Sequence, residues 1–197
     1  MSDKLEYKKM DLENLVILSQ QDNFKALEEL IKKVQKDVFA TLSYMLKSND
    51  NIYDLTQDVL MKFARNIKNL NNPKCFRGWL NHITTNAYYD YMRKTKRKPE
   101  TIPLEYSCPS TNSDVNIEIP DKRSKPMEKC ITAECEHQVK KAIRGLPDAF
   151  RIAIILREFQ GLSYEEIANT TNASIGTVKS RISRARIKLQ NDLKNYT

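Results

Sequence analysis

A proline-rich stretch divides this sequence near its middle. Five of the seven prolines fall between residues 99 and 126, where the chain has no helical period. Proline fixes its own φ and lacks a backbone donor, so we expect an extended, semi-stiff segment there. Such a segment could reach roughly 90 Å fully stretched and about 30 Å as a coil. Because a structureless stretch of this length is unusual inside one compact domain, the sequence predicts two domains.

Both flanking halves have helical periodicity. Apolar residues recur at three- and four-residue steps over residues 27–45 and 55–70, and a third helix is expected over 76–98. In the second half we expect a helix over 128–144, then one with Pro147 in its first turn and Gly161 at its end. No alternation of strand and helix patterns occurs. We therefore predict an all-α fold of two small helical domains, residues 11–98 and 128–197, joined by a long Pro-rich linker over 99–127.

The charge of the chain favours an anionic partner. Its formal net charge is +8 and its pI is near 9.2, which indicates nucleic acid first and an anionic membrane surface second. No apolar run is long enough to span a membrane, and the N-terminus mixes acids with bases and lacks an apolar core for a signal peptide. We expect a cytoplasmic protein.

The cysteines do not have the spacing of a metal site. Zinc sites need paired cysteine or histidine ligands, and the nearest approach here is Cys130, Cys135 and His137. Cys75 and Cys108 are isolated. We predict ordinary thiols in a reducing compartment, with no metal and no cofactor.

A helix-turn-helix is expected near the C-terminus. Ser163 and Glu166 have the spacing of a capping box that starts a short helix. Asn172 stands where the following turn needs a left-handed residue, and Ser174 can cap the next helix. A short helix, a tight turn and a longer helix make up this motif.

The second helix of this motif has one apolar side and one polar side. At 100° per residue, Ile175, Val178, Ile182, Ala185 and Leu189 form a core stripe. Gly176 lies on the outer face, where its missing side chain allows close approach of another backbone. An apolar back, small polar residues near the helix start and basic flanks are typical of a helix that enters the major groove. The alternative is an ordinary amphipathic helix with solvated arginines. Ile187 also projects outward, for which neither interpretation accounts.

Two helices of the first half also have candidate surfaces. The third helix interleaves Trp79, Tyr88, Tyr89 and Tyr91 with bases, which suits opened DNA, although the rings could instead fill the core. The second helix has a mixed-charge face of Asp54, Gln57, Asp58, Met61 and Arg65. Such a face is either solvated or a protein contact.

Three segments together resemble one family. DLTQDVLMKF resembles a core-polymerase-binding helix, FRGWLNHITTNAYYDYMRKTKR a promoter −10 segment, and the stretch from LPDAF to ARIKL a −35-binding domain. In this order they resemble bacterial RNA polymerase sigma factors of the extracytoplasmic-function (ECF) type. Four positions depart from the family pattern. Asn172 replaces a turn glycine, Thr171 and Ala173 stand where larger apolar residues are common, and Asp58 replaces a glutamate.

The resemblance implies a factor that binds the RNA polymerase core and directs it to the −10 and −35 elements of promoters, without catalysis of its own. It implies a polymerase contact through Asp54, Leu55, Gln57, Asp58 and Met61. It implies a −10 contact through Trp79, His82, Asn86, Asp90, Arg93, Lys94, Lys96 and Arg97. It implies a −35 contact through Ser174, Gly176, Thr177, Lys179, Ser180, Arg181, Ser183 and Arg184. An anti-sigma factor is a further partner of typical relatives, and no small-molecule substrate is expected.

Two other functions compete with this interpretation. A self-sufficient helix-turn-helix regulator would bind palindromic DNA as a dimer, but no helix has a clean heptad seam. A nucleic-acid enzyme would need clustered carboxylates for metal or a histidine base, and both histidines are isolated.

Overall fold

The structure is a computed structural model that describes residues 7–48, 51–97 and 126–194; within these ranges the side chains of residues 96–97 and 126–133 are not described. All regular elements of the described residues are helical. The predicted all-α fold is therefore confirmed. The predicted organisation into two small helical domains joined by a linker is confirmed with it. Most of the predicted linker, together with Cys108, lies outside the described residues, and so does the side chain of Cys130.

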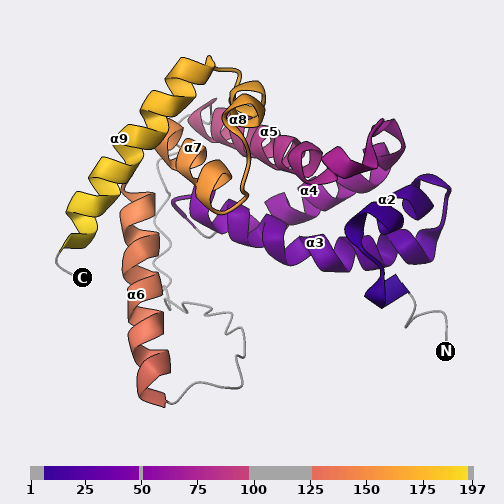
Figure 1. Cartoon of the computed structure of the whole chain (residues 1–197), viewed down its shortest axis with the longest axis horizontal. Coiled ribbons are helices and arrows are strands. Elements are labelled where there is room, and N and C mark those ends of the chain that lie inside the picture. The colour runs from indigo at the N-terminus through magenta and orange to yellow at the C-terminus, as the bar shows by residue number, and fades with distance from the viewer. Residues whose placement is uncertain (1–6, 49–50, 98–125, 195–197) are drawn as a thin grey trace, which may run out of the picture.

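The first half packs four α-helices around one core (Figure 1). Their bounds, with two short 3₁₀ turns, are α2 Leu12–Gln20, α3 Phe24–Met45, α4 Ile52–Asn66, η1 Ile67–Asn69, η2 Pro73–Cys75 and α5 Phe76–Arg97. The predicted stripes form this core: Leu30, Val34, Val38 and Leu42 of α3 are buried, and so are Val59 and Phe63 of α4. Asn23 caps α3 by accepting a hydrogen bond from the Ala26 amide.

The second half contains the helices α6 Pro126–Arg144, α7 Asp148–Glu158, α8 Tyr164–Thr171 and α9 Ile175–Leu193. α7 packs against both α8 and α9, and α6 contacts α9 (Figure 1). Gly161, just beyond α7, has a φ of 67°, a conformation that glycine adopts without strain. Pro147 differs slightly from prediction, because it is the N-cap of α7 and precedes the first turn.

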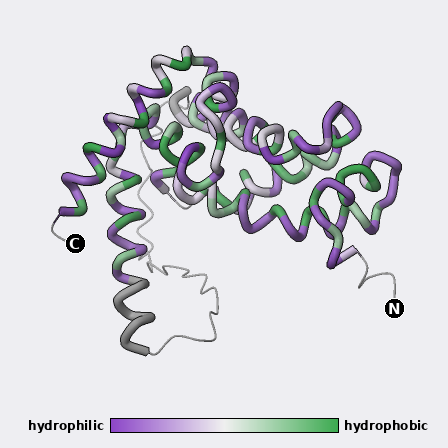
Figure 2. The backbone as a smooth tube through the Cα atoms, viewed as in Figure 1, coloured by the Kyte–Doolittle hydropathy of each residue, from purple (hydrophilic) through white to green (hydrophobic). Residues whose placement is uncertain are grey.

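The two halves pack directly against each other, which the sequence did not predict. α3 contacts α6 and α7, and α5 contacts α8 (Figure 1). Hydrophobic and hydrophilic residues alternate along the helices instead of forming long apolar blocks (Figure 2). Consistent with this pattern, no helix of the described residues is long and apolar enough to cross a bilayer.

Candidate nucleic-acid and protein interfaces

The predicted helix-turn-helix is formed by α8 and α9. Ser163 Oγ accepts the Glu166 amide at 3.1 Å, and Glu166 Oε2 accepts the Ser163 amide at 2.8 Å, so the capping box is complete. Asn172 ends α8 with φ 51° and ψ 48°, the left-handed conformation expected from the sequence. Ser174 caps α9 by accepting the Thr177 amide at 3.1 Å. These local bonds fix how α9 leaves the turn.

α9 buries one face and exposes the other. Val178, Ile182 and Ala185 are buried, which confirms most of the core stripe. Ile175 was predicted to belong to this stripe and does not, since its side chain is 40% exposed. It is the first residue of α9, one turn before the helix becomes covered. Ile187 is 57% exposed and projects outward as expected.

The eight predicted −35 residues lie at the start of α9 and on its outer side. Thr177 and Arg181 are half-buried, and the others are exposed: Ser174, Gly176, Lys179, Ser180, Ser183 and Arg184. Two hydroxyls have local partners, because Ser174 Oγ and Thr177 Oγ1 lie 2.8 Å apart and Ser180 Oγ donates to the Thr177 carbonyl at 2.9 Å. The structure thus gathers the predicted residues on one surface.

Gly176 is not required by internal packing. A Cβ built at this position would meet only Ser174 Oγ, at 3.9 Å, which is an ordinary van der Waals distance. The fold therefore has room for a side chain here. A glycine at an exposed helix start leaves room for another molecule's backbone to approach closely.

The basic flanks of α9 differ in their partners. Arg186 makes two hydrogen bonds to Glu158 Oε1, at 2.6 and 3.1 Å, and this pairing raises the pKa of Arg186. Lys179 lies over the Tyr164 ring, with Nζ 5.8 Å from its centroid. Arg184 is exposed and projects from the outer face, so we expect it to be the most available of these cations for a phosphate or base.

Only some of the α5 residues that were predicted to contact the −10 element are exposed to solvent. His82, Asn86, Arg93 and Lys94 are exposed, with Asn86 Nδ2 lying 3.3 Å from the His82 ring. The half-buried Asp90 accepts a hydrogen bond from Arg93, and its carboxylate is 3.9 Å from Lys62 Nζ. Lys96 and Arg97 belong to α5, but their side chains lie outside the described residues. The exposed residues form a polar strip along one side of the helix.

The aromatic residues of α5 are less exposed than stacking platforms would be. Tyr88 is 1% exposed, which contradicts its interpretation as a stacking ring in this state. Trp79 and Tyr89 are half-buried, and Trp79 packs edge-on against Phe63 at a centroid distance of 6.4 Å. Burial raises the pKa of Tyr89, with Arg181 nearby as an opposing charge. The core interpretation, left open by the sequence, holds for Tyr88.

α4 presents the mixed-charge face predicted for protein contact. Asp54, Gln57 and Asp58 are exposed, and Met61 is 49% exposed. Leu55, which the resemblance includes in the polymerase contact, is 7% exposed and lies on the core side of the helix, as its place in the apolar stripe predicts. Sequence reasoning missed Tyr53, which is 58% exposed and precedes Gln57 and Met61 by four and eight residues on the same helical strip. That spacing was the signal that could have found it.

No metal centre is assembled in the part of the chain that the structure describes. It contains no group of three or more histidine, cysteine, aspartate or glutamate side chains placed to hold an ion. Cys75 and Cys135 are exposed free thiols.

Comparison with known families gives two matches that lie on either side of the Pro-rich stretch. Residues 30–98 match the family described as Sigma-70 region 2. Residues 136–189 match Sigma-70, region 4. The first range contains α4 and α5, and the second contains α7, α8 and most of α9.

Individual relatives match most of the chain. The ECF RNA polymerase sigma-E factor of Haemophilus influenzae is 34% identical over 181 residues, which cover 91% of this chain and 93% of the relative. The sigma-E factor of Escherichia coli K12 is 31% identical over 177 residues, covering 90% and 91%. The sigma factor RpoE from Bartonella quintana, solved in complex with the anti-sigma factor NepR, superposes with a TM-score of 0.66 at 30% identity, covering 86% of this chain and 98% of that one.

Proposed function

This chain belongs to the ECF family of RNA polymerase sigma factors, and from that membership we propose which of its surfaces bind the polymerase and which bind DNA. As a sigma factor it binds the polymerase core and directs it to promoters for transcription initiation. It is an initiation factor and not an enzyme. This membership disfavours the two competing interpretations, an enzyme acting on nucleic acid and a self-sufficient dimeric regulator.

In the second half, α9 enters the major groove of the −35 element. The observation that carries this assignment is the open outer face of α9, on which a glycine without an internal packing role stands beside exposed Ser180, Ser183 and Arg184. Small residues near the helix start allow close approach, and the helix N-terminus favours phosphate. Arg184 would contact a base edge or phosphate, whereas Lys179 would contact the backbone from the flank.

In the first half, the polar strip of α5 holds the −10 element while it opens. His82, Asn86 and Arg93 supply exposed donors and acceptors on one side of the helix. The family resemblance assigns five further residues to this element: Trp79, Asp90, Lys94, Lys96 and Arg97. Flipping a base out of the stack costs a few kcal/mol, so a surface that repays this cost for one base reads sequence.

The polymerase contact is made by the exposed face of α4. Asp54, Gln57 and Asp58 would bind the polymerase clamp, with Met61 and Tyr53 supplying apolar contact area. Leu55 would contribute indirectly, because its buried side chain holds α4 against the core.

We further propose an anti-sigma factor as a regulatory partner. The RpoE chain to which this one is similar was solved with its anti-sigma factor NepR, and CnrH, which has a similar fold, was solved with the cytosolic domain of CnrY. Action in the cytoplasm follows from the location of polymerase and chromosome in bacteria.

Run-off transcription on a genomic fragment library tests this function. Bacterial core polymerase would be assayed with and without the protein. Discrete new start sites that require both components are expected, and alignment of the regions upstream should give two short elements. Footprints from the protein alone, without new starts, would instead indicate a self-sufficient regulator.

A further inference from the structure

Ile187 is an exposed apolar residue in the basic part of α9. Its side chain is 57% exposed, more than that of any other large hydrophobic residue in the described part of the second half. A β-branched residue is not among the best helix formers, and at this exposure it gains little from burial. Neither the packing of α9 nor its helical structure therefore requires an isoleucine at this position.

The residue lies on the same strip of α9 as the residues that we assign to DNA. At 3.6 residues per turn, Ile187 is within about 20° of both Gly176 and Ser180 around the helix axis. It lies opposite the buried Val178 and follows the exposed Arg184 by about 4.5 Å along the axis. The proposed DNA surface thus continues through Ile187 without interruption.

The distribution of charge along α9 supports this continuation. The five bases of the helix all lie between residues 179 and 188, and its one acid, Asp192, follows a turn later. A surface that meets a polyanion is favoured where bases gather and disfavoured where an acid appears. Ile187 therefore lies within the basic segment and not beyond it.

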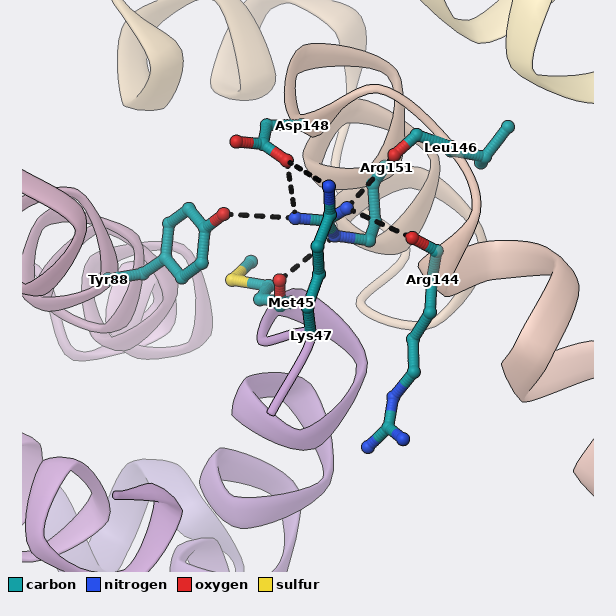
Figure 3. Close-up of polar contacts among 7 residues, drawn as sticks. All are labelled: Met45, Lys47, Tyr88, Arg144, Leu146, Asp148 and Arg151. Carbon is teal, nitrogen blue, oxygen red and sulfur yellow. Dashed lines mark hydrogen bonds and ion pairs between the residues drawn. The ribbon is translucent and has the colours of Figure 1, made fainter. Parts of the chain in front are cut away.

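The arginine next to Ile187 on the outer face is available to an outside partner. Arg151 of α7, in contrast, is 0% exposed and donates to the Tyr88 hydroxyl at 3.1 Å and to Asp148 at 2.7 Å (Figure 3). Arg184 is exposed, and no side chain among the described residues binds its guanidinium. A polyanion that reaches Arg184 also covers Ile187, which lies on the next turn of the same face.

The length of this surface indicates how α9 lies in the groove. From Gly176 to Ile187 it extends roughly 17 Å along the axis. The major groove is about 12 Å wide, so a helix lying across it would place its two ends at the two phosphate backbones. An isoleucine is a poor partner for phosphate. Along the groove, the same surface covers about five base pairs at 3.4 Å each, with Ile187 at the edge of a base pair at one end.

The major groove offers one apolar group to such a side chain. Thymine presents its 5-methyl group there, whereas the other base edges present hydrogen-bond donors and acceptors that isoleucine cannot satisfy. We propose that Ile187 contacts the methyl group of a thymine at one end of the −35 element, and that it is a specificity-determining residue of this chain. The proposal rests on the assignment of α9 to the −35 element.

Uracil substitution tests this contact, because it removes the thymine methyl and leaves the base pair otherwise unchanged. Promoter fragments identified by run-off transcription carry deoxyuridine in place of each thymine of the −35 element, one at a time. Core polymerase with the full-length protein is bound to each fragment, and its affinity is measured by mobility shift.

At one end of the element, uracil should weaken binding of the unsubstituted protein about three- to fourfold, the loss expected for one buried methyl group. The same uracil should change binding of the Ile187→Ala protein less than about 1.5-fold, because the group that contacts the methyl is already absent. Ile187→Val keeps part of the side chain and should show an intermediate effect.

Lys188→Ala is the matched control. This neighbouring side chain is exposed on the flank of α9. Loss of its phosphate contact should weaken binding to the thymine and uracil fragments equally and reduce the salt dependence of binding by about one unit of slope. Ile187→Ala should leave the salt dependence unchanged, because an isoleucine carries no charge.

Two results would overturn the proposal alone. If every uracil affects the unsubstituted protein and the Ile187→Ala protein equally, Ile187 contacts no thymine methyl. If Ile187→Ala instead lowers affinity for core polymerase without DNA, the residue is a polymerase contact. Failure of the proposed function is distinguishable from both, since the unsubstituted protein would then produce no new start sites and no −35 element to substitute.

Discussion

α5 and α9 are similar in length and both rich in bases, yet they are packed differently. α9 rests on α6, α7 and α8 with one face, and its other face is open. α5 contacts α3 and α4 of its own half and α8 of the other. It consequently buries Thr84, Thr85 and Tyr88 in addition to its apolar residues. Basic content alone therefore does not distinguish a helix with a free face from one held between two halves.

The largest expected effect tests whether α9 has a single buried face. Ile182→Ala should lower the free energy of unfolding by about 2–4 kcal/mol, because it removes buried methyl groups from a 2% exposed site and leaves a cavity. Urea unfolding followed by circular dichroism measures it. The adjacent Ser183→Ala on the open face should change stability by less than about 0.5 kcal/mol. Equal effects at both positions would contradict the one-sided packing.

The second prediction compares Arg184 with Arg186, two arginines of α9 of which the second is paired with Glu158. Arg184→Ala should weaken binding of the −35 element by about 1–3 kcal/mol, since no described side chain holds this guanidinium. Arg186→Ala should cost less, because Glu158 already holds that guanidinium. The two variants are compared by mobility shifts of the polymerase–protein complex on matched promoter fragments, over a series of salt concentrations. If Arg186 proved the more important, the assignment of the outer face would be wrong.

The sequence predicted the features that depend on neighbouring residues and missed those that depend on contact between the two halves. The α9 stripe, the Asn172 turn and the Ser163–Glu166 box are set by residues a few positions apart, so local periodicity and capping rules sufficed. The burial of Tyr88 depends on Arg151, which is 63 positions away in sequence, and on docking of the two halves. No local pattern records such a contact. Of the two interpretations of Tyr88 that the sequence left open, the core one holds for that reason, whereas the burial of Leu55 follows from its own place in the apolar stripe of α4.

α4 sharpens the comparison because its open face carries acids beside bases, whereas the charged residues on the open face of α9 are basic. Asp58→Ala should lower affinity for the polymerase core by about 1–2 kcal/mol, the effect of losing one well-placed charged contact. Fluorescence titration of labelled protein with core polymerase measures this. Asp192→Ala, an exposed acid near the end of α9, serves as a matched control and should leave core affinity unchanged. Wild-type affinity of the Asp58 variant would refute the assignment of α4.

The exposed strip of α5 should behave as a reading surface even though the helix is largely covered. Asn86→Ala should reduce promoter opening by about 1 kcal/mol, roughly fivefold, since one polar contact to an unstacked base is lost. Permanganate footprinting of the −10 region reports opening. Binding of a fragment that carries only the −35 element should be unaffected. A loss on both fragments would indicate a folding defect in place of base recognition.

The smallest effect is the most discriminating, because stability and function should move in opposite directions. Gly176→Ala has room for its Cβ, and alanine is the better helix former, so the free energy of unfolding should rise by up to about 0.5–1 kcal/mol. Affinity for the −35 element should nevertheless fall, because the new methyl group stands where the DNA backbone approaches. Urea unfolding and mobility shifts on the same preparation give both values. A glycine kept only for folding would show stability and binding changing together, whereas opposite signs would place Gly176 at the DNA surface.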